Sequence, residues 1–310
     1  MQTLDPDRPS GVFTAVLTPF DETGAPDVGS LALHCRWLLA NGSEGLSVLG
    51  TTGEANSLTV DERLHLLERL VAGGIPAGVL LPGTGCCAIP DTVRLTERAV
   101  QLGAAGVLLL PPFYYKGVSE DGVFAAVAEV IERVGEGRLR IYLYHFPQMT
   151  AVPFGAALIE RLLKRYPGTI AGIKDSSGDL ANMLANAARF PGFDVFSGAD
   201  ELLLPLLRGG GAGCITGVCN VAAPLAAKVH AAWVRGDEAA AAEAHAHLAA
   251  VRATFLGFPL SAALKAVLAR HSGRGGWLRI RPPLTPLPPE SAEALLGALD
   301  RLAFAPAAII

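Results

Sequence analysis

The chain has 310 residues, of which 51% are hydrophobic and 17% are charged, so it can bury a large core and does not have the composition of a disordered polymer. The net charge is -4, and no basic run is interleaved with aromatic residues, which argues against a nucleic-acid partner. The longest apolar run, residues 106–113, is far shorter than the roughly 20 residues that span a bilayer, so we expect no membrane partner.

The five cysteines predict a reducing compartment and no metal site. Their number is odd, and the adjacent Cys86 and Cys87 cannot readily pair with each other, so we expect free thiols. Cys214 and Cys219 have no histidine near them at ligand spacing, which argues against zinc. Together with the short apolar runs, this predicts a cytoplasmic protein.

Two kinds of segment alternate along the chain up to residue 235. Short runs rich in Val, Ile and Leu predict buried parallel strands, and longer segments with helical spacing and charged faces predict helices between them. The strands are expected, in chain order, at residues 12–18, 45–49, 78–81, 106–110, 139–144, 169–174, 193–196 and 212–216. The helices are expected at residues 30–40, 59–71, 89–101, 121–134, 153–165, 180–189, 200–208 and 223–235. Thr59 and Ser119, each followed by acidic residues, are predicted N-caps.

Eight strand–helix units in regular alternation favour an α/β fold of the closed (β/α)8 TIM barrel type over an open doubly wound sheet. The first strand is not followed by the Gly-x-Gly-x-x-Gly motif of dinucleotide-binding folds, although the pattern alone leaves an open sheet as the alternative. After residue 236 the pattern changes to three further helices, at residues 237–253, 259–270 and 289–304. We therefore divide the chain into a barrel that carries the active site, residues 1–235, and a C-terminal helical extension packed on it, residues 236–310.

Lys174 is the first candidate for chemistry, because the active site of a parallel barrel lies at the carboxyl ends of the strands. This lysine ends the sixth predicted strand, after the apolar run Ile-Ala-Gly-Ile at residues 170–173. Partial desolvation at such a position favours a neutral, nucleophilic amine, which can condense with a ketone to form an iminium. The alternative is a lysine whose stem packs while its head reaches solvent.

Tyr144 ends the fifth predicted strand, one strand–helix unit before Lys174, so the two side chains are expected on neighbouring strand ends. A phenol in that place can relay protons, or it can be an aromatic of the rim. Tyr142 alternates in step with Tyr144, so one of the two tyrosines can serve packing alone. His145 would point elsewhere and is expected to be structural.

Three loops at the proposed active face add glycines and hydroxyl groups. Residues 50–54, Gly-Thr-Thr-Gly-Glu, follow the second strand, and their N–H groups and two hydroxyls suit a carboxylate, although a tight turn needs the same glycines. Residues 111–116 form a stiff loop with Tyr114 and Tyr115 that can pack at a subunit interface or supply a hydroxyl. The glycine-rich residues 209–217 lack the lysine of a P-loop and suit the close approach of a carboxylate or of packed backbone.

Taken together, these stretches resemble the dihydrodipicolinate synthase / N-acetylneuraminate lyase family of Schiff-base aldolases. Residues 50–54 are similar to its carboxylate-binding loop, residues 144–147 to its tyrosine motif, and residues 172–177 to its Schiff-base motif. The three motifs keep their order and spacing, and the similarity covers about residues 11–290. The resemblance implies a barrel enzyme of the lyase class that uses no metal and no organic cofactor.

The resemblance also implies roles for single residues. Thr51 and Tyr115 would complete a proton relay with the tyrosine of the strand end, and Tyr115 would reach in from a neighbouring subunit, which implies a homodimer or homotetramer. Thr52 and Gly50 would bind the substrate carboxylate. The backbone of Ile215 would line the pocket for pyruvate.

Met149 departs from the family pattern. Members that make the lysine precursor usually carry an arginine at this place, two residues after the proline of the tyrosine motif, and it binds the carboxylate of aspartate semialdehyde. Methionine cannot pair with a carboxylate, so the sequence favours a substrate whose second half is neutral or apolar. Candidates are a 2-keto-3-deoxy sugar acid aldolase or dehydratase, and a hydratase-aldolase.

We therefore expect a Schiff-base-forming lyase or aldolase that acts on a small molecule, pyruvate or another 2-oxo acid. An alternative with the same chemistry is a 4-hydroxy-tetrahydrodipicolinate synthase that joins pyruvate and aspartate semialdehyde. Two further alternatives are a non-catalytic 2-oxo-acid-binding protein and a structural oligomer without a ligand. Binding alone needs only the carboxylate loop, so the presence of Lys174, Tyr144 and Thr51 favours an enzyme.

Overall fold

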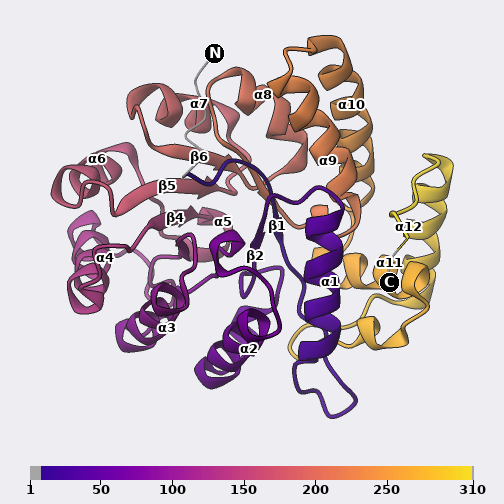
Figure 1. The fold of residues 1–310 in the computed structure, drawn as a ribbon, viewed down its shortest axis with the longest axis horizontal. Coiled ribbons are helices and arrows are strands. Elements are labelled where there is room, and N and C mark those ends of the chain that lie inside the picture. Colours follow the sequence, from indigo (N-terminus) through magenta and orange to yellow (C-terminus); the bar gives the residue numbers. More distant parts are fainter. Residues whose placement is uncertain (1–7, 309–310) are drawn as a thin grey trace.

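A computed structural model describes residues 8–308 of the chain. Within this range, seven parallel strands form one sheet in the order β2-β1-β7-β6-β5-β4-β3, and Figure 1 shows the helices arranged around it. The strands are β1 (Gly11–Ala15), β2 (Gly45–Ser47), β3 (Val107–Leu109), β4 (Ile141–His145), β5 (Ile170–Asp175), β6 (Asp194–Ser197) and β7 (Gly213–Thr216). The expected parallel barrel is confirmed, with one correction.

Residues 80–84 close the barrel in place of an eighth strand. Their N–H groups donate to carbonyls on and just after β2, and they exchange two hydrogen bonds with Leu108 of β3. The strand expected at residues 78–81 is therefore wrong in type and position, because Ala77–Val79 is a 3-10 helix and the extended segment begins after it. Pro82 has no N–H to donate, so the pairing stays limited to isolated bridges.

Apart from the short α5, the helices of the barrel part lie around the outside of the sheet (Figure 1), and most agree with the expected ranges to within a few residues. They are α1 (Val28–Ala40), α2 (Val60–Ala72), α3 (Ile89–Leu102), α4 (Glu120–Val134), α5 (Pro147–Thr150), α6 (Ala156–Arg165), α7 (Leu180–Arg189), α8 (Leu203–Arg208) and α9 (Cys219–Val234). The sequence did not predict the short α5, and it placed the start of α9 too late.

Two predicted N-caps are confirmed. The side chain of Thr59 accepts a hydrogen bond from the N–H of Glu62, whose carboxylate accepts one from the N–H of Thr59, so the pair forms a capping box at the start of α2. Ser119 accepts from the N–H of Gly122 at the start of α4. These caps fix where the two helices begin after their active-face loops.

The core has two layers, as a barrel requires. An inner cluster fills the barrel, and its two phenylalanines meet edge to face at 5.7 Å between ring centroids. Its buried members are Phe13, Ala15, Leu81, Leu108, Tyr142, Ala171, Phe196 and Ile215. A larger outer layer lies between the strands and the helices.

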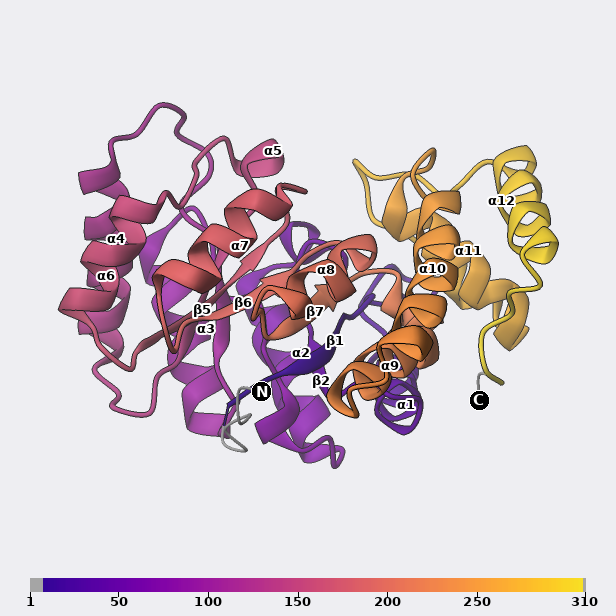
Figure 2. The same cartoon turned by 90° about the horizontal axis from the view of Figure 1, so that it is seen from above.

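Three further helices follow where the sequence predicts them: α10 (Glu238–Thr254), α11 (Leu260–Ser272) and α12 (Pro289–Arg301). Helix α10 packs against α9, and Figure 2 shows α11 and α12 at one end of the molecule, opposite α4 and α6. Residues 1–7 and 309–310 of the expected domains lie outside the described residues, and the boundary at residue 235 stays a prediction. No helix between residues 8 and 308 is both long and apolar enough to cross a membrane.

Candidate active site

Lys174 and Tyr144 lie side by side at the ends of two neighbouring strands. They are partners in the parallel register of β4 and β5, so their side chains point to the same face. Both are buried, with 5% and 4% of the residue exposed. The amine Nζ of Lys174 lies 4.3 Å from the centroid of the Tyr144 ring. The expected proximity of Lys174 and Tyr144 is confirmed. The amine of Lys174 is in contact with an aromatic ring and is shielded from bulk water.

The residues directly after Lys174 end β5 through a network around Asp175. This carboxylate is fully buried and accepts hydrogen bonds from the N–H and hydroxyl of Ser177, at 2.8 and 2.5 Å, and from the Asn182 side chain at 2.7 Å. Asp179 then caps the start of α7. The chain turns away one residue after Lys174, which leaves this lysine at the carboxyl end of the strand.

The neighbours of Tyr144 have other tasks, as the sequence predicts. Tyr142 is 1% exposed and its hydroxyl donates to the Asp194 carboxylate at 3.2 Å, so it packs inside the barrel. Burial raises the pKa of Tyr142 far above that of a free phenol, and Asp194 adds to the shift. His145 accepts a hydrogen bond from the N–H of Phe154 at 3.1 Å. Burial lowers the pKa of His145, which fits a neutral structural histidine.

The loop of residues 50–54 is bordered by two residues in the left-handed conformation. Leu49 has φ 59° and Glu54 has φ 57°, and a side chain in this region is strained. Gly53 packs on the end of β1, where a Cβ would lie 2.7 Å from the carbonyl of Val16. The hydroxyl of Thr18 donates to the carbonyl of Gly53 at 2.7 Å. The surrounding structure therefore imposes the shape of this loop.

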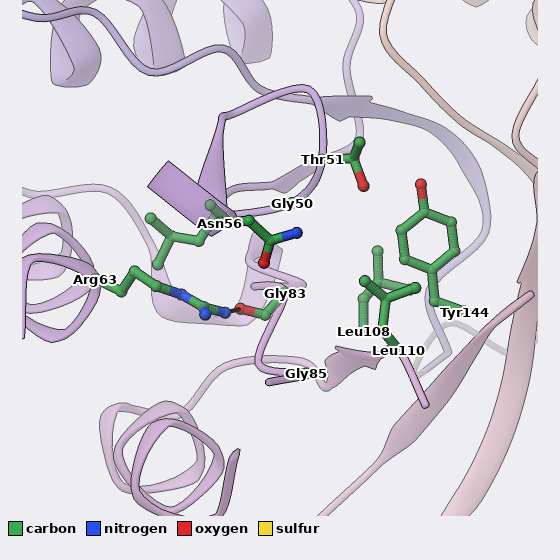
Figure 3. A pocket seen from close by; sticks show the side chains of 11 residues that line it. Gly50, Thr51, Asn56, Arg63, Gly83, Gly85, Leu108, Leu110 and Tyr144 are labelled. Atoms are coloured by element: carbon green, nitrogen blue, oxygen red, sulfur yellow. Dashed lines mark hydrogen bonds between the residues drawn. The ribbon is translucent and has the colours of Figure 1, made fainter. Parts of the chain in front are cut away.

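The loop and Tyr144 line one pocket. Figure 3 shows the hydroxyls of Thr51 and Tyr144 pointing toward one another across it. Lys174 contacts the ring of Tyr144 and does not line this pocket itself. The lining consists of Leu49, Gly50, Thr51, Ala55, Asn56, Arg63, Gly83, Gly85, Leu108, Leu110 and Tyr144. Three of the predicted residues, Gly50, Thr51 and Tyr144, are thus brought together.

Arg63 in the same pocket was missed by the sequence analysis. It lies on α2, is 3% exposed, and donates to the carbonyl of Gly83 at 2.7 Å and to the thiol of Cys86 at 3.1 Å. Its Nε has no hydrogen-bond partner among the described residues. A charged residue near the start of a helix normally lies at the surface, so the pattern gave no signal for this buried cation.

Four predicted residues do not line this pocket in the single chain. Tyr115 is 72% exposed and stacks edge to face on Tyr114. Met149 is 61% exposed on α5. Ile215 is fully buried in β7 and packs inside the barrel. Thr52 is partly buried, and its carbonyl accepts a hydrogen bond from Ser261.

The glycine-rich stretch before β7 serves backbone packing. Gly213 has φ 146°, and a Cβ there would lie 1.9 Å from the carbonyl oxygen of Gly11. Of the two uses expected for this stretch, the geometry favours packed backbone at this position. The five cysteines are all free, as expected.

The fold and the strand-end residues define a parallel α/β barrel protein with a candidate active site at the carboxyl ends of its strands. Residues 8–301 match the model of the Dihydrodipicolinate synthetase family. The chain belongs to this family, and the protein is an enzyme of the lyase class. The resemblance inferred from three motifs is confirmed.

Relatives and solved structures of this family are similar to the protein along most of its chain. An uncharacterized DapA-like lyase of Chloroflexus aurantiacus is 37% identical over 95% of this chain and 97% of that protein. The 4-hydroxy-tetrahydrodipicolinate synthase of Bacillus subtilis is 31% identical over 94% and 98%. The structure of dihydrodipicolinate synthase from Agrobacterium tumefaciens has a TM-score of 0.85 at 30% identity and covers 95% of this chain and 99% of its own. The E. coli prophage protein YagE, of the dihydrodipicolinic acid synthase family and solved in complex with pyruvate, has a TM-score of 0.85 at 28% identity over 95% and 98%.

Proposed function

We propose that this protein is a Schiff-base-forming lyase that acts on pyruvate or a related 2-oxo acid, with Lys174 as the nucleophile. The observation that carries the proposal is the contact of the buried Lys174 amine with the ring of Tyr144, 4.3 Å away, at adjacent strand ends. The pyruvate complex of YagE supports the same substrate class.

The reaction begins when Nζ of Lys174 attacks C2 of the 2-oxo acid. A C–N bond forms, the carbonyl oxygen takes up two protons and leaves as water, and an iminium remains. When the bond between C3 and C4 breaks, its electron pair moves into the iminium and gives an enamine. The C4 hydroxyl gives its proton to the relay of Thr51, Tyr144 and Tyr115, and C4 leaves as an aldehyde. Protonation of C3 and hydrolysis of the iminium then release pyruvate and the free lysine. Dehydration uses the same iminium–enamine pair.

Proton transfer falls to Thr51, Tyr144 and Tyr115. Thr51 and Tyr144 face the same pocket, so their hydroxyls can pass a proton to the departing water. Tyr115 is 72% exposed in the single chain, and we propose that it enters the site of a neighbouring subunit in a homodimer or homotetramer. Thr52 and Gly50 bind the substrate carboxylate, and the backbone of Ile215 lines the pyruvate end of the site.

Met149 bears on the second half of the substrate. Its exposed thioether offers no charge to a second carboxylate, which favours a neutral partner such as the polyol end of a 2-keto-3-deoxy sugar acid. The alternative is 4-hydroxy-tetrahydrodipicolinate synthesis, the activity that names the Bacillus subtilis relative. In that case another cation must replace the arginine. A non-catalytic 2-oxo-acid-binding protein is the alternative from another class.

Borohydride trapping with pyruvate tests the proposal. The imine is reduced to a stable secondary amine, which intact-mass spectrometry detects as a single added 1-carboxyethyl group. Wild-type protein and Lys164→Ala, which changes an exposed lysine of α6, should both form the adduct, and Lys174→Ala should not. Pyruvate binding without an adduct would support the binding protein. No adduct with pyruvate or longer 2-oxo acids in a folded wild type would exclude the Schiff-base mechanism.

A further inference from the structure

The carboxylate-binding loop, residues 50–54, is held by residues of the C-terminal region, on α11 and in the segment that follows it. Its last residue, Glu54, does not line the pocket, and its side chain is completely buried. One carboxylate oxygen accepts from Nζ of Lys265 on α11 at 2.5 Å, and the other accepts from the N–H of Arg281 at 3.0 Å. Both oxygens of this loop residue are therefore bound by residues that follow the barrel.

Lys265 is enclosed by residues that compensate its charge. Its side chain is 1% exposed, and Nζ also donates to the carbonyl of Arg279 at 2.8 Å and lies 4.5 Å from the ring centroid of Phe20. A buried ammonium is unfavourable unless a charge and hydrogen bonds compensate it. Glu54 supplies the charge, so neither residue of the pair can move without leaving the other charge buried and unpaired.

Two further contacts join the same regions. The hydroxyl of Ser261, in the first turn of α11, donates to the carbonyl of Thr52 at 3.1 Å. The guanidinium of Arg281 makes two hydrogen bonds to Glu62, at 2.5 and 2.9 Å, at the start of the helix that follows the loop. The loop is thus bound by the C-terminal region at its middle, at its end and at the next helix.

We propose that the buried ion pair of Glu54 and Lys265 positions the carboxylate-binding loop, so that Lys265 is a positioning residue of the active site although it lies in the C-terminal region. The inference rests on the proposed function, because it assumes that Thr51 and Thr52 serve the substrate. The strained φ angles of Leu49 and Glu54 give the physical reason. Without the pair, the loop can relax toward ordinary backbone conformations, and the hydroxyl of Thr51 leaves its place opposite Tyr144.

The test compares pyruvate trapping in Lys265→Met, Glu54→Gln and the double variant. Each single change should raise the half-saturating pyruvate concentration by about tenfold or more, because small misplacements of binding groups are costly. The maximal trapping rate should fall less. The double variant removes both charges, so its melting temperature should recover toward wild type while its half-saturation stays raised. If the pair only stabilised the fold, both the melting temperature and the half-saturating pyruvate concentration of the double variant would return toward wild type.

Leu268→Ala is the matched control, since this fully buried residue of α11 belongs to the apolar core and not to the ion pair. It should lower the melting temperature and leave the half-saturation unchanged. Ser261→Ala provides a mild variant if Lys265→Met does not fold, and it should shift the half-saturation in the same direction. Unchanged half-saturation in every folded variant would overturn the inference. A wild type that forms no adduct would instead overturn the proposed function.

Discussion

Tyr144 and Tyr142 provide a matched pair of variants that separates catalysis from stability. They lie two residues apart on β4, and Tyr→Phe removes only the hydroxyl from each. In Tyr144→Phe the ring keeps its contact with Lys174 at 4.3 Å and its stacking on Phe146 at 5.8 Å between centroids. The hydroxyl of Tyr144 has no hydrogen-bond partner among residues 8–308, whereas that of Tyr142 donates to the partly buried Asp194.

The expected magnitudes follow from these contacts. Loss of a proton-relay group slows a reaction by about 10²–10⁴-fold, which corresponds to roughly 3–5 kcal/mol of barrier. Tyr144→Phe should therefore slow imine formation by this factor and leave the melting temperature nearly unchanged. Loss of the hydrogen bond to Asp194 should cost about 1–2 kcal/mol of stability in Tyr142→Phe. That variant should melt a few degrees lower and trap pyruvate at the wild-type rate.

Stopped-flow trapping and thermal melts, recorded on the same preparations, measure both quantities. Tyr144→Phe should lower the trapping rate but not the melting temperature, and Tyr142→Phe should lower the melting temperature but not the trapping rate. If Tyr142→Phe slows trapping as much as Tyr144→Phe does, or if Tyr144→Phe traps pyruvate at the wild-type rate, the assignment of Tyr144 as the relay group is wrong.

Three other predictions concern the fold. Gly213→Ala places a Cβ 1.9 Å from the carbonyl oxygen of Gly11, so it should destabilise the protein by more than about 4 kcal/mol or abolish soluble expression, whereas Gly78→Ala, with nothing within 4 Å, should not. Thr59→Ala breaks the capping box of α2 and should cost about 1 kcal/mol in urea unfolding. Burial raises the pKa of Asp200 from 3.8 to about 6, so between these pH values the folded protein keeps a proton that the unfolded chain has lost, and the free energy of unfolding falls as pH rises. Asp200→Asn should remove this fall. The free energy of unfolding is measured by urea melts at several pH values across that range, and a pH dependence equal to that of the wild type would contradict the prediction.

The sequence predicted those parts of the site that depend on strand order. Lys174 and Tyr144 end consecutive strands, and in a parallel barrel consecutive strand ends are neighbours, so their contact followed from the pattern. The strand expected at residues 78–81 was not placed correctly. Pro82 interrupts the hydrogen-bond ladder, and the apolar run gives no sign that Ala77–Val79 forms a 3-10 helix.

Other features depend on contacts that no local pattern encodes. Glu54 and Lys265 are 211 positions apart, and each alone resembles an ordinary charge of a loop or a helix. The burial of Arg63 depends on how α2 packs beside residues 83–86. The roles of Tyr115 and Met149 came from family resemblance, and both side chains are exposed in the single chain, so only an assembled oligomer with substrate can test them.

Peptide mapping of the reduced pyruvate adduct tests the central claim most directly. The chain has five lysines, of which Lys174 and Lys265 are the buried ones. Because Lys265 is held by Glu54 while Lys174 lies at the strand end beside Tyr144, the 1-carboxyethyl group should be found on Lys174 alone. An adduct on Lys265 or spread over the exposed lysines, with Lys174 unmodified, would contradict the account.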